Sequence, residues 1–413
     1  MTNNTKPTAA KDGEKPGLMP KLRFLELRAT GWIQKKLEDV APLQRGFDLP
    51  SDLIRPGNIP IVYSNGIQKY HEVGMATAPG LVTGRSGTIG KLHFIESGDY
   101  WPHNTSLWVT SFNGNVPRFV FYLYDSIGMS RFSSGSGVPT LNRNDVHAFG
   151  VSIPSSSAEQ QKIADCLSSL DELIAAQARK VDALKTHKKG LMQQLFPREG
   201  ETQPRRRFPE FQNAGDWEVK KIEDIARRGS GHTPNKAKPE YYNGGIKWVS
   251  LADSKRLDNG KIFETATLIS ELGIKNSSAV LHPAGSVILS RDAGVGKSAV
   301  LNESMAVSQH FVVWTCDNRS LSNWFLYYFL QFNKPVFENV ATGSTIKTIG
   351  LPFFKELCIT IPSVPEQQCI SSSLSDLDAL ITAETQKLEA LKTHKKGLMQ
   401  QLFPSVGGVA GEA

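Results

Sequence analysis

The sequence LKTHKKGLMQQLFP occupies residues 184–197 and recurs without a single substitution at residues 391–404. The two copies are 207 positions apart in a chain of 413 residues. An identical repeat of this length does not arise by chance, and it indicates that the chain consists of two similar halves. Each half therefore needs the same segment.

The similarity extends upstream of the repeated segment, to the start of a helix. Ile153-Pro154 and Ile361-Pro362 correspond, and Glu-Gln-Gln follows at 159–161 and at 366–368. Proline disfavours the helical conformation in the residue before it, so each Ile-Pro pair should be extended. A helix is expected to begin near each Glu-Gln-Gln and to stop at the Phe-Pro that closes each copy.

A 4-3 spacing of apolar residues runs through both helices. In the first copy the apolar seam positions are Ile163, Leu167, Leu170, Ile174, Val181, Leu184, Leu191 and Leu195. In the second they are Ile370, Leu374, Leu377, Ile381, Leu388, Leu391, Leu398 and Leu402. The polar exceptions are Gln177 and Lys188, matched by Glu384 and Lys395. Such a repeat over about five heptads predicts a coiled-coil seam, and we expect the two helices to pair antiparallel.

The segment before each helix also repeats, but more loosely. The anchors that recur are Trp32 and Trp217, TGRSGTIGK (83–91) and LSRDAGVGK (289–297), and SSGSGVPTL (133–141) and ATGSTIKTI (341–349). Between them, short Val, Ile and aromatic runs broken by Gly, Pro and Asn predict many short strands. The predicted fold class is α+β. Two domains of mixed short strands and helices, related by a pseudo-twofold axis, are joined and followed by two long helices that form an antiparallel coiled coil.

Composition and charge narrow the class of protein. The net charge is +7 and the pI is about 9.1, which suits a phosphate-rich partner such as nucleic acid. The sequence has no run of about 18 apolar residues and no apolar N-terminal signal, so we expect a cytoplasmic location without a membrane segment. The four cysteines form no CxxC pair, which argues against a zinc module or a disulfide scaffold.

These repeated residues resemble the specificity subunit of a type I restriction-modification system. The resemblance is carried by the duplicated Ile-Pro…Glu-Gln-Gln opening, the Gly-Leu-Met-Gln-Gln-Leu-Phe close of each helix, and the Trp…Glu-Asp start of each domain. It covers nearly all of residues 20–404. The implied segments are a disordered tail (1–20), target recognition domain 1 (21–154), helical region 1 (155–197), a linker (198–206), target recognition domain 2 (207–360), helical region 2 (361–404) and a second tail (405–413).

The resemblance also implies a function. The subunit itself would be non-catalytic, and each domain would read one half of a two-part, asymmetric site in double-stranded DNA. The paired helices would set the spacer between the halves and dock two methylation subunits, which methylate adenine. Restriction subunits would cleave unmodified DNA. S-adenosylmethionine, ATP and Mg are expected on the partner subunits, and no cofactor or metal is expected on this chain.

The Gly-rich turns are the first candidates for DNA contact. Arg85 and Lys91 in the first turn correspond to Arg291 and Lys297 in the second. A turn with exposed backbone amides and two cations suits phosphates, and arginine can also bind guanine in the major groove. The alternative is a strand turn whose arginine packs internally. The second turn is not a nucleotide-binding phosphate loop, because Arg291 stands where that motif needs glycine.

Other polar residues are weaker candidates, each with ordinary surface as the alternative. They are Ser64, Asn65, Lys69, Arg131, Ser250, Asp253, Lys255 and Lys347. We expect residues 59–69 and 246–255 to be counterparts in the two domains. The run Arg205-Arg206-Arg207 is interpreted as a solvated linker rather than a DNA clamp.

The sequence lacks the motifs of a DNA-modifying enzyme. No Asn/Asp-Pro-Pro-aromatic tetrapeptide is present, and neither a GxGxxG after a strand nor a helicase-type phosphate loop occurs. Chemistry on DNA would therefore come from partner chains. The remaining alternative is a coiled-coil scaffold that does not read DNA, against which the basic charge and the divergent domain interiors argue.

Overall fold

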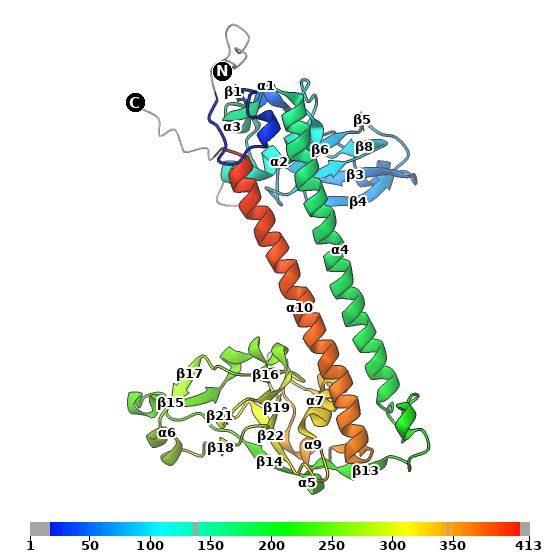
Figure 1. The fold of residues 1–413 in the computed structure, drawn as a ribbon, viewed down its shortest axis with the longest axis vertical. Coiled ribbons are helices and arrows are strands. Elements are labelled where there is room, and N and C mark those ends of the chain that lie inside the picture. Colours follow the sequence, from blue (N-terminus) through cyan, green and yellow to red (C-terminus); the bar gives the residue numbers. More distant parts are fainter. Residues whose placement is uncertain (1–16, 135–138, 345–346, 405–413) are drawn as a thin grey trace, which may run out of the picture. The chain divides into compact units, whose positions relative to one another are not determined.

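The computed structural model describes residues 17–134, 139–344 and 347–404 (Figure 1). The chain forms two compact units: Met1–Ala178 with Gln386–Ala413, and Arg179–Thr385. Each unit contains one domain, part of one long helix and the complementary part of the other. Each long helix is therefore divided between the two units.

In the first unit, two four-stranded sheets form the domain. One has the order β2(Leu43–Arg45), β9(Ser106–Val109), β6(Gly80–Gly84), β7(Leu92–Ile95). The other has the order β4(Gly66–His71), β3(Ile59–Tyr63), β8(Asp99–Pro102), β5(Ala76–Thr77). The domain also contains the strand pairs β1(Trp32–Lys36) with β12(Gly150–Pro154) and β10(Ser133–Ser134) with β11(Thr140–Leu141), and the α-helices α1(Leu37–Val40), α2(Pro117–Ile127) and α3(Arg143–His147).

The second unit repeats this plan with one five-stranded and one four-stranded sheet. One has the order β14(Ala226–Ser230), β22(Phe311–Cys316), β19(Val287–Ser290), β20(Ser298–Leu301), β16(Lys261–Ile262). The other has the order β17(Thr267–Ile269), β15(Tyr242–Val249), β21(Met305–Val307), β18(Leu281–His282). The unit also contains the strand pair β13(Glu218–Lys221) with β23(Cys358–Ile361), and the α-helices α5(Ile222–Ile225), α6(Glu271–Lys275), α7(Asn323–Phe332), α8(Lys334–Val340) and α9(Leu351–Lys355). The predicted mixture of short strands and helices is confirmed.

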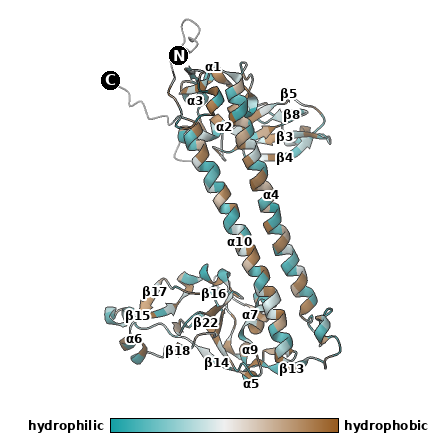
Figure 2. Ribbon diagram, viewed as in Figure 1, coloured by the Kyte–Doolittle hydropathy of each residue, from teal (hydrophilic) through white to brown (hydrophobic). Residues whose placement is uncertain are grey.

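The two long helices are α4(Ser157–Leu195) and α10(Val364–Leu402), each 39 residues long. Both stop at the predicted Phe-Pro. Hydropathy alternates along each long helix, whereas central strands such as β19 and β22 are largely apolar (Figure 2). That difference follows from burial, because a helix exposes one face to solvent while central strands are covered on both sides.

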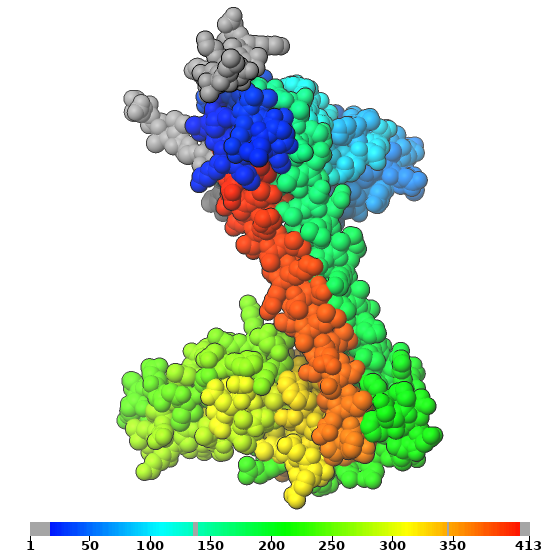
Figure 3. Space-filling view, in the orientation of Figure 1, coloured from blue at the N-terminus to red at the C-terminus, as the bar shows by residue number. Residues whose placement is uncertain are grey.

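Antiparallel pairing of the helices is confirmed within each unit. In the first unit Ile163 and Leu167, near the start of α4, share a core with Leu402 and Phe403 at the end of α10. Figure 3 shows this end of α10 in red beside the dark blue N-terminal segment, where the Leu22 amide donates to the Gln401 carbonyl at 2.9 Å.

The second unit reverses the roles of the helices. There Leu195 and Phe196 from the end of α4 share a core with Ile370 and Leu374 from the start of α10. The identical Leu-Phe of each repeated segment therefore closes the core of a different domain.

The structure explains both Glu-Gln-Gln motifs. Glu159 is buried and accepts from Arg23 at 2.6 Å, while Glu366 is buried and accepts from Arg207 at 2.6 Å. Burying one carboxylate in each helix start requires such a charged partner. Arg207 is therefore an internal ion-pair residue, and the interpretation of it as solvated linker is wrong.

The first glutamine of each motif fixes the domain's main helix. The side-chain carbonyl of Gln160 accepts from the Val116 amide at 2.9 Å, directly before α2. The side-chain carbonyl of Gln367 accepts from the Ser322 amide at 2.8 Å, directly before α7. Each glutamine thereby satisfies a backbone amide at a helix start that would otherwise lack an acceptor.

The two lysines that interrupt the apolar seam have carboxylate partners. Lys188 lies 2.5 Å from Asp378, and Lys395 lies 2.6 Å from Asp171. In each unit a tyrosine hydroxyl, from Tyr328 or Tyr122, donates to the second oxygen of that aspartate, and the lysine ammonium lies 5.2 Å from the tyrosine ring. Burial raises the pKa of both tyrosines, which keeps the hydroxyls protonated as donors.

Replacing Lys188 with methionine is expected to lower the free energy of unfolding by about 1–2 kcal/mol, because Asp378 would lose its cation in a partly buried seam. Urea denaturation followed by circular dichroism measures this. Lys395→Met should cost a similar amount. The control is Lys392→Met, which removes a lysine that pairs with Glu389 where both side chains are more than half exposed, at 51% and 63%. It should cost less than about 0.5 kcal/mol, and equal losses for Lys392 and Lys188 would contradict the assignment.

Candidate nucleic-acid interface

The Gly-rich turns follow equivalent buried strands in the two domains. Every residue of β6 and of β19 is buried, so the chain emerges from each core at the arginine that follows. Gly90 and Gly296 occupy matching places, with φ of 89° and 83°. L side chains rarely adopt this left-handed conformation, which explains why both copies carry glycine there.

Backbone hydrogen bonds hold both turns in the same frame. The amide of Arg85 donates to the Thr105 carbonyl, and its own carbonyl accepts from the Leu141 amide at 2.8 Å. The amide of Arg291 donates to the His310 carbonyl, and its carbonyl accepts from the Ile349 amide at 3.0 Å. In each domain, the Gly-rich turn (83–91 or 289–297) is therefore hydrogen-bonded to the second repeated anchor (133–141 or 341–349). Residues 135–138 and 345–346 of the second anchor lie outside the described residues.

The loops after β3 and β15 approach these turns. The strands themselves are equivalent, because β3 pairs in parallel with β8 and β15 pairs in parallel with β21, as expected for counterparts. The Lys91 ammonium donates to the Asn65 carbonyl at 3.1 Å, and the Lys297 ammonium donates to the Ser254 carbonyl at 3.1 Å. Each domain thus ties its turn to the preceding loop through a matching lysine.

The comparisons with known proteins agree with this duplicated construction. The family model described as type I restriction modification DNA specificity domain matches residues 30–186 and 214–393, which together are most of the chain. The chain belongs to that family. It carries two such specificity domains, each with part of the helix that follows.

Curated relatives and solved structures support the assignment. The specificity subunit of the type I restriction enzyme MjaIX from Methanocaldococcus jannaschii is 29% identical over 46% of this chain. That of MjaVIII from the same organism is 24% identical over 66% of this chain. The matches span 44% and 65% of those relatives' own lengths.

Two solved structures have the same fold. One is the S subunit of a type I restriction-modification system from M. genitalium, with a TM-score of 0.62 and 14% identity over 94% of this chain and 100% of that one. The other comes from work on complex assembly and conformational transition of the type I R-M system, with a TM-score of 0.56 and 16% identity over 91% of this chain and 98% of that one.

The two arginines of the specificity domains differ in their surroundings. Among the described residues, the Arg85 guanidinium has no hydrogen-bond or ion-pair partner, and the side chain is partly exposed. Arg291 donates from Nε to the Ile349 carbonyl at 3.0 Å and is 19% exposed. Arg85 is therefore available to an external ligand. Arg291 instead packs within its own turn, as in the alternative to DNA contact described above.

The second specificity domain gathers cations around its turn. A cavity of about 550 Å³ is lined by Lys297, Lys334 and Lys347, by Glu338, and by residues 293–295 of the turn. Lys297 also pairs with Asp258 at 2.7 Å. Three cations against one lining carboxylate, beside exposed backbone, suit a phosphate group. Lys334 was missed by sequence reasoning, because it comes to the turn only through the packing of α8.

Asp253 is a correction to the predicted interface. Its side chain is fully buried, and its carboxylate accepts from the amides of Ser250 and Ala266 and from Arg256 at 2.6 Å. The carboxylate closes a short capping box after β15 and has no face left for DNA. Ser250 belongs to the same cap and remains partly exposed, so it stays a candidate.

The other weak candidates remain on the surface. Lys69 on β4, Lys255 and Asn65 are exposed, and Ser64 lies against the first turn, where a Cβ added at Gly84 would be 3.1 Å from its Cβ. Exposure permits contact with DNA without requiring it. These residues therefore stay predictions.

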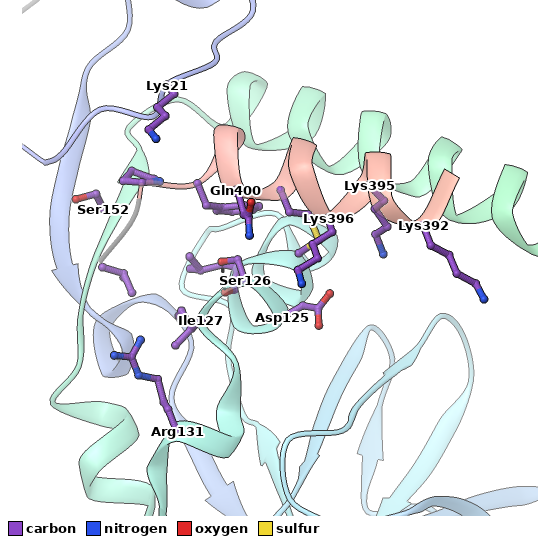
Figure 4. A pocket seen from close by; sticks show the side chains of 15 residues that line it. Lys21, Asp125, Ser126, Ile127, Arg131, Ser152, Lys392, Lys395, Lys396 and Gln400 are labelled. Carbon is purple, nitrogen blue, oxygen red and sulfur yellow. Dashed lines mark hydrogen bonds between the residues drawn. The ribbon is translucent and has the colours of Figure 1, made fainter. Parts of the chain in front are cut away.

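Arg131 faces a different, cationic cavity in the first unit (Figure 4). Its guanidinium lies 4.8 Å from the ring of Phe149. The charged residues that line this cavity of about 740 Å³ are Lys21, Asp125, Arg131, Lys392, Lys395 and Lys396. Burial raises the pKa of Asp125, and Lys395 opposes the shift. Three of the lysines belong to the repeated fourteen-residue segment, so this cavity brings the repeat and the domain together.

The described residues contain no group of three or more His, Cys, Asp or Glu arranged to hold a metal ion. None of the helices in the described part of the chain is both long and apolar enough to cross a membrane.

Proposed function

We propose that this chain is the non-catalytic DNA-recognition subunit of a cytoplasmic type I restriction-modification complex. Each specificity domain reads one half of a two-part, asymmetric site in double-stranded DNA. The observation that carries the proposal is the duplicated turn: the backbone frame, the arginine and the lysine are the same in both domains, while side chains between them, such as Ser86 and Asp292, differ. One frame with two sets of side chains suits the reading of two different half-sites.

The charge of the chain supports contact with a polyanion. The net charge is +7, and the cations at the turns, Arg85 in one domain and Lys347 in the other, are exposed or partly exposed. Phosphate contacts of this kind position a protein on DNA, and base-edge contacts beside them supply the sequence preference.

The long helices would set the spacer, because 39 residues of helix span about 58 Å and half-sites one turn of DNA apart are separated by about 34 Å.

The repeated fourteen-residue segment is the proposed docking surface for methylation subunits. Its outward positions are exposed in both copies: Lys185, Thr186, His187, Lys189, Gln193 and Gln194, and Lys392, Thr393, His394, Lys396, Gln400 and Gln401. Packing constrains buried residues, but it does not require exposed residues to be the same in two places. Two copies of one partner would require this identity. Those partners would bind S-adenosylmethionine and methylate adenine, and restriction subunits would use ATP and Mg.

Replacing Lys189 and Lys396 together with glutamate is expected to weaken binding of the methylation subunits by roughly tenfold or more. Each docking surface would carry a negative charge in place of a positive one, which removes its electrostatic complementarity to the partner. Isothermal titration of the purified chain with its methylation subunit measures this. The matched control is Arg179→Glu with Lys387→Glu, two exposed cations on the same helices outside the repeat. Equal weakening by both pairs would contradict the proposed surface.

Salt-dependent DNA binding tests the proposed function against the scaffold alternative. The assembled complex should bind duplex DNA that carries its site, and the affinity should fall steeply between about 50 and 200 mM salt as counterions are released, as is typical when several phosphates are contacted. A scaffold that does not read DNA would show no preference among duplexes at any salt concentration.

A further inference from the structure

A pair of polar side chains occupies the same place in both domains but has different chemistry. The Phe47 amide donates to the Pro102 carbonyl at 2.8 Å, and the His232 amide donates to the Val307 carbonyl at 3.0 Å. These bonds link the segment after β2 to the end of β8, and the segment after β14 to the end of β21. Residue 48 of the first domain and residue 233 of the second, which follow these amides, are therefore equivalent positions.

The next residues interact in the same way in both domains. In the first, the Asn104 side-chain amide donates to the Asp48 carboxylate. In the second, the Thr233 hydroxyl donates to the side-chain carbonyl oxygen of Gln309 at 2.6 Å. Asn104 is two residues beyond β8 and Gln309 two residues beyond β21, so the partners are equivalent as well.

Both pairs lie next to the Gly-rich turns. Thr105 follows Asn104 and accepts from the Arg85 amide, and His310 follows Gln309 and accepts from the Arg291 amide. Asp48 and Gln309 are exposed, and their partners are partly exposed. The second pair also borders a cavity of about 650 Å³ that is lined by Lys236, Trp248 and Ser250. Each pair is therefore open to a ligand that the adjacent turn contacts.

Stability does not account for the difference between the pairs. Backbone hydrogen bonds fix the frame on both sides, and a hydrogen bond between exposed side chains adds little to it. Packing would accept either pair. The hydrogen-bonding groups differ, however. The first domain presents the carboxylate of Asp48 and the amide of Asn104, and the second presents the hydroxyl of Thr233 and the amide of Gln309 on its longer side chain.

We propose that residues 48 and 104 in the first domain, and 233 and 309 in the second, determine which bases each domain accepts. This inference rests on the proposed function of DNA recognition. Carboxylates accept from the exocyclic amino group of cytosine, whereas glutamine can bind the N6 and N7 edge of adenine. The Asp48–Asn104 pair favours a base with an exocyclic amino donor, and the Thr233–Gln309 pair favours adenine.

Exchange of the pairs tests the inference. One variant carries Asp48→Thr with Asn104→Gln, and the reciprocal variant carries Thr233→Asp with Gln309→Asn. Each replaces the wild-type chain in cells that keep the methylation subunits but lack restriction activity, and methyladenine is mapped at base resolution. The expected result is at least a roughly tenfold loss of methylation at the wild-type motif. For each variant, the sequence preference should change in one half-site only.

Control variants keep the test decisive. Asp48→Asn and Gln309→Glu alter hydrogen bonding with almost no change of shape, and they should lower methylation at the same half-sites even where a double exchange fails to fold. Thr77→Ala removes an exposed hydrogen bond to Asp99 on another edge of the first domain and should leave the motif unchanged. An unchanged motif and methylation level in all exchange and isosteric variants would overturn the inference. Absence of any motif dependent on the wild-type chain would instead overturn the proposed function.

Discussion

Replacing Glu366 with alanine is expected to lower the free energy of unfolding by about 3–5 kcal/mol, because the Arg207 guanidinium would remain buried without its carboxylate. The side chains of Glu366 and Arg207 are only 1% and 12% exposed, and two hydrogen bonds join them, at 2.8 and 2.6 Å. The pair also raises the pKa of Arg207. Urea denaturation of the full chain, followed by circular dichroism and tryptophan fluorescence, measures the loss.

The first domain provides a matched variant, Glu159→Ala. Glu159 accepts from Arg23, from the Thr30 hydroxyl at 2.7 Å and from the Trp32 indole at 3.2 Å, so its loss should be at least as large. The double variant Glu366→Met with Arg207→Met should recover much of the loss, because it leaves no unpaired buried charge. A single Glu366→Ala variant that unfolds at the wild-type urea concentration would contradict a structural role for the pair.

Removing the cations of the Gly-rich turns should weaken DNA binding by the assembled complex. Arg85→Ala with Lys91→Ala is expected to reduce affinity by roughly 10- to 100-fold, because fewer phosphates are neutralised. The slope of log affinity against log salt should fall by about 1 for each phosphate that the variant no longer neutralises. Fluorescence anisotropy with a labelled duplex over a series of salt concentrations measures both quantities.

The second domain should respond differently at its arginine. Arg291 is held by the Ile349 carbonyl, so Arg291→Ala alone should weaken binding less than Arg85→Ala alone. Arg143→Ala, which removes an exposed arginine on α3 of the first domain, serves as a comparison for the general effect of losing one charge. If Arg85→Ala has the same affinity and the same salt slope as the wild-type chain, the first turn does not contact DNA.

Much of the fold could be predicted because its determinants are local and repeated. The seam residues recur at 4-3 spacing, the Phe-Pro pairs stop the helices, and matching anchors identify equivalent parts of the domains. The seam lysines show where this reasoning stops. Lys188 and Lys395 read as interruptions of a coiled coil, and their partners Asp378 and Asp171 are far away in sequence.

The candidate site was harder to predict, because it depends on contacts between distant segments. Asp253 looked like an exposed polar residue after a strand, yet its carboxylate is buried and accepts a hydrogen bond from the amide of Ala266, thirteen residues further along the chain. Arg207 looked like part of a charged linker. A signal was nevertheless present: Arg-Phe-x-Glu occurs at 23–26 and at 207–210, and comparison of these segments would have identified Arg23 and Arg207 as equivalent.

A base-resolution methylation map of cells with and without this gene tests the recognition role most directly. We predict that one two-part, asymmetric motif carries methyladenine in the first cells and loses it in the second, while every other methylated motif is unchanged. Restoring the gene should restore that motif. A map that is identical with and without the gene, in cells where the methylation and restriction subunits are expressed, would contradict the proposal that this chain selects the DNA sequence.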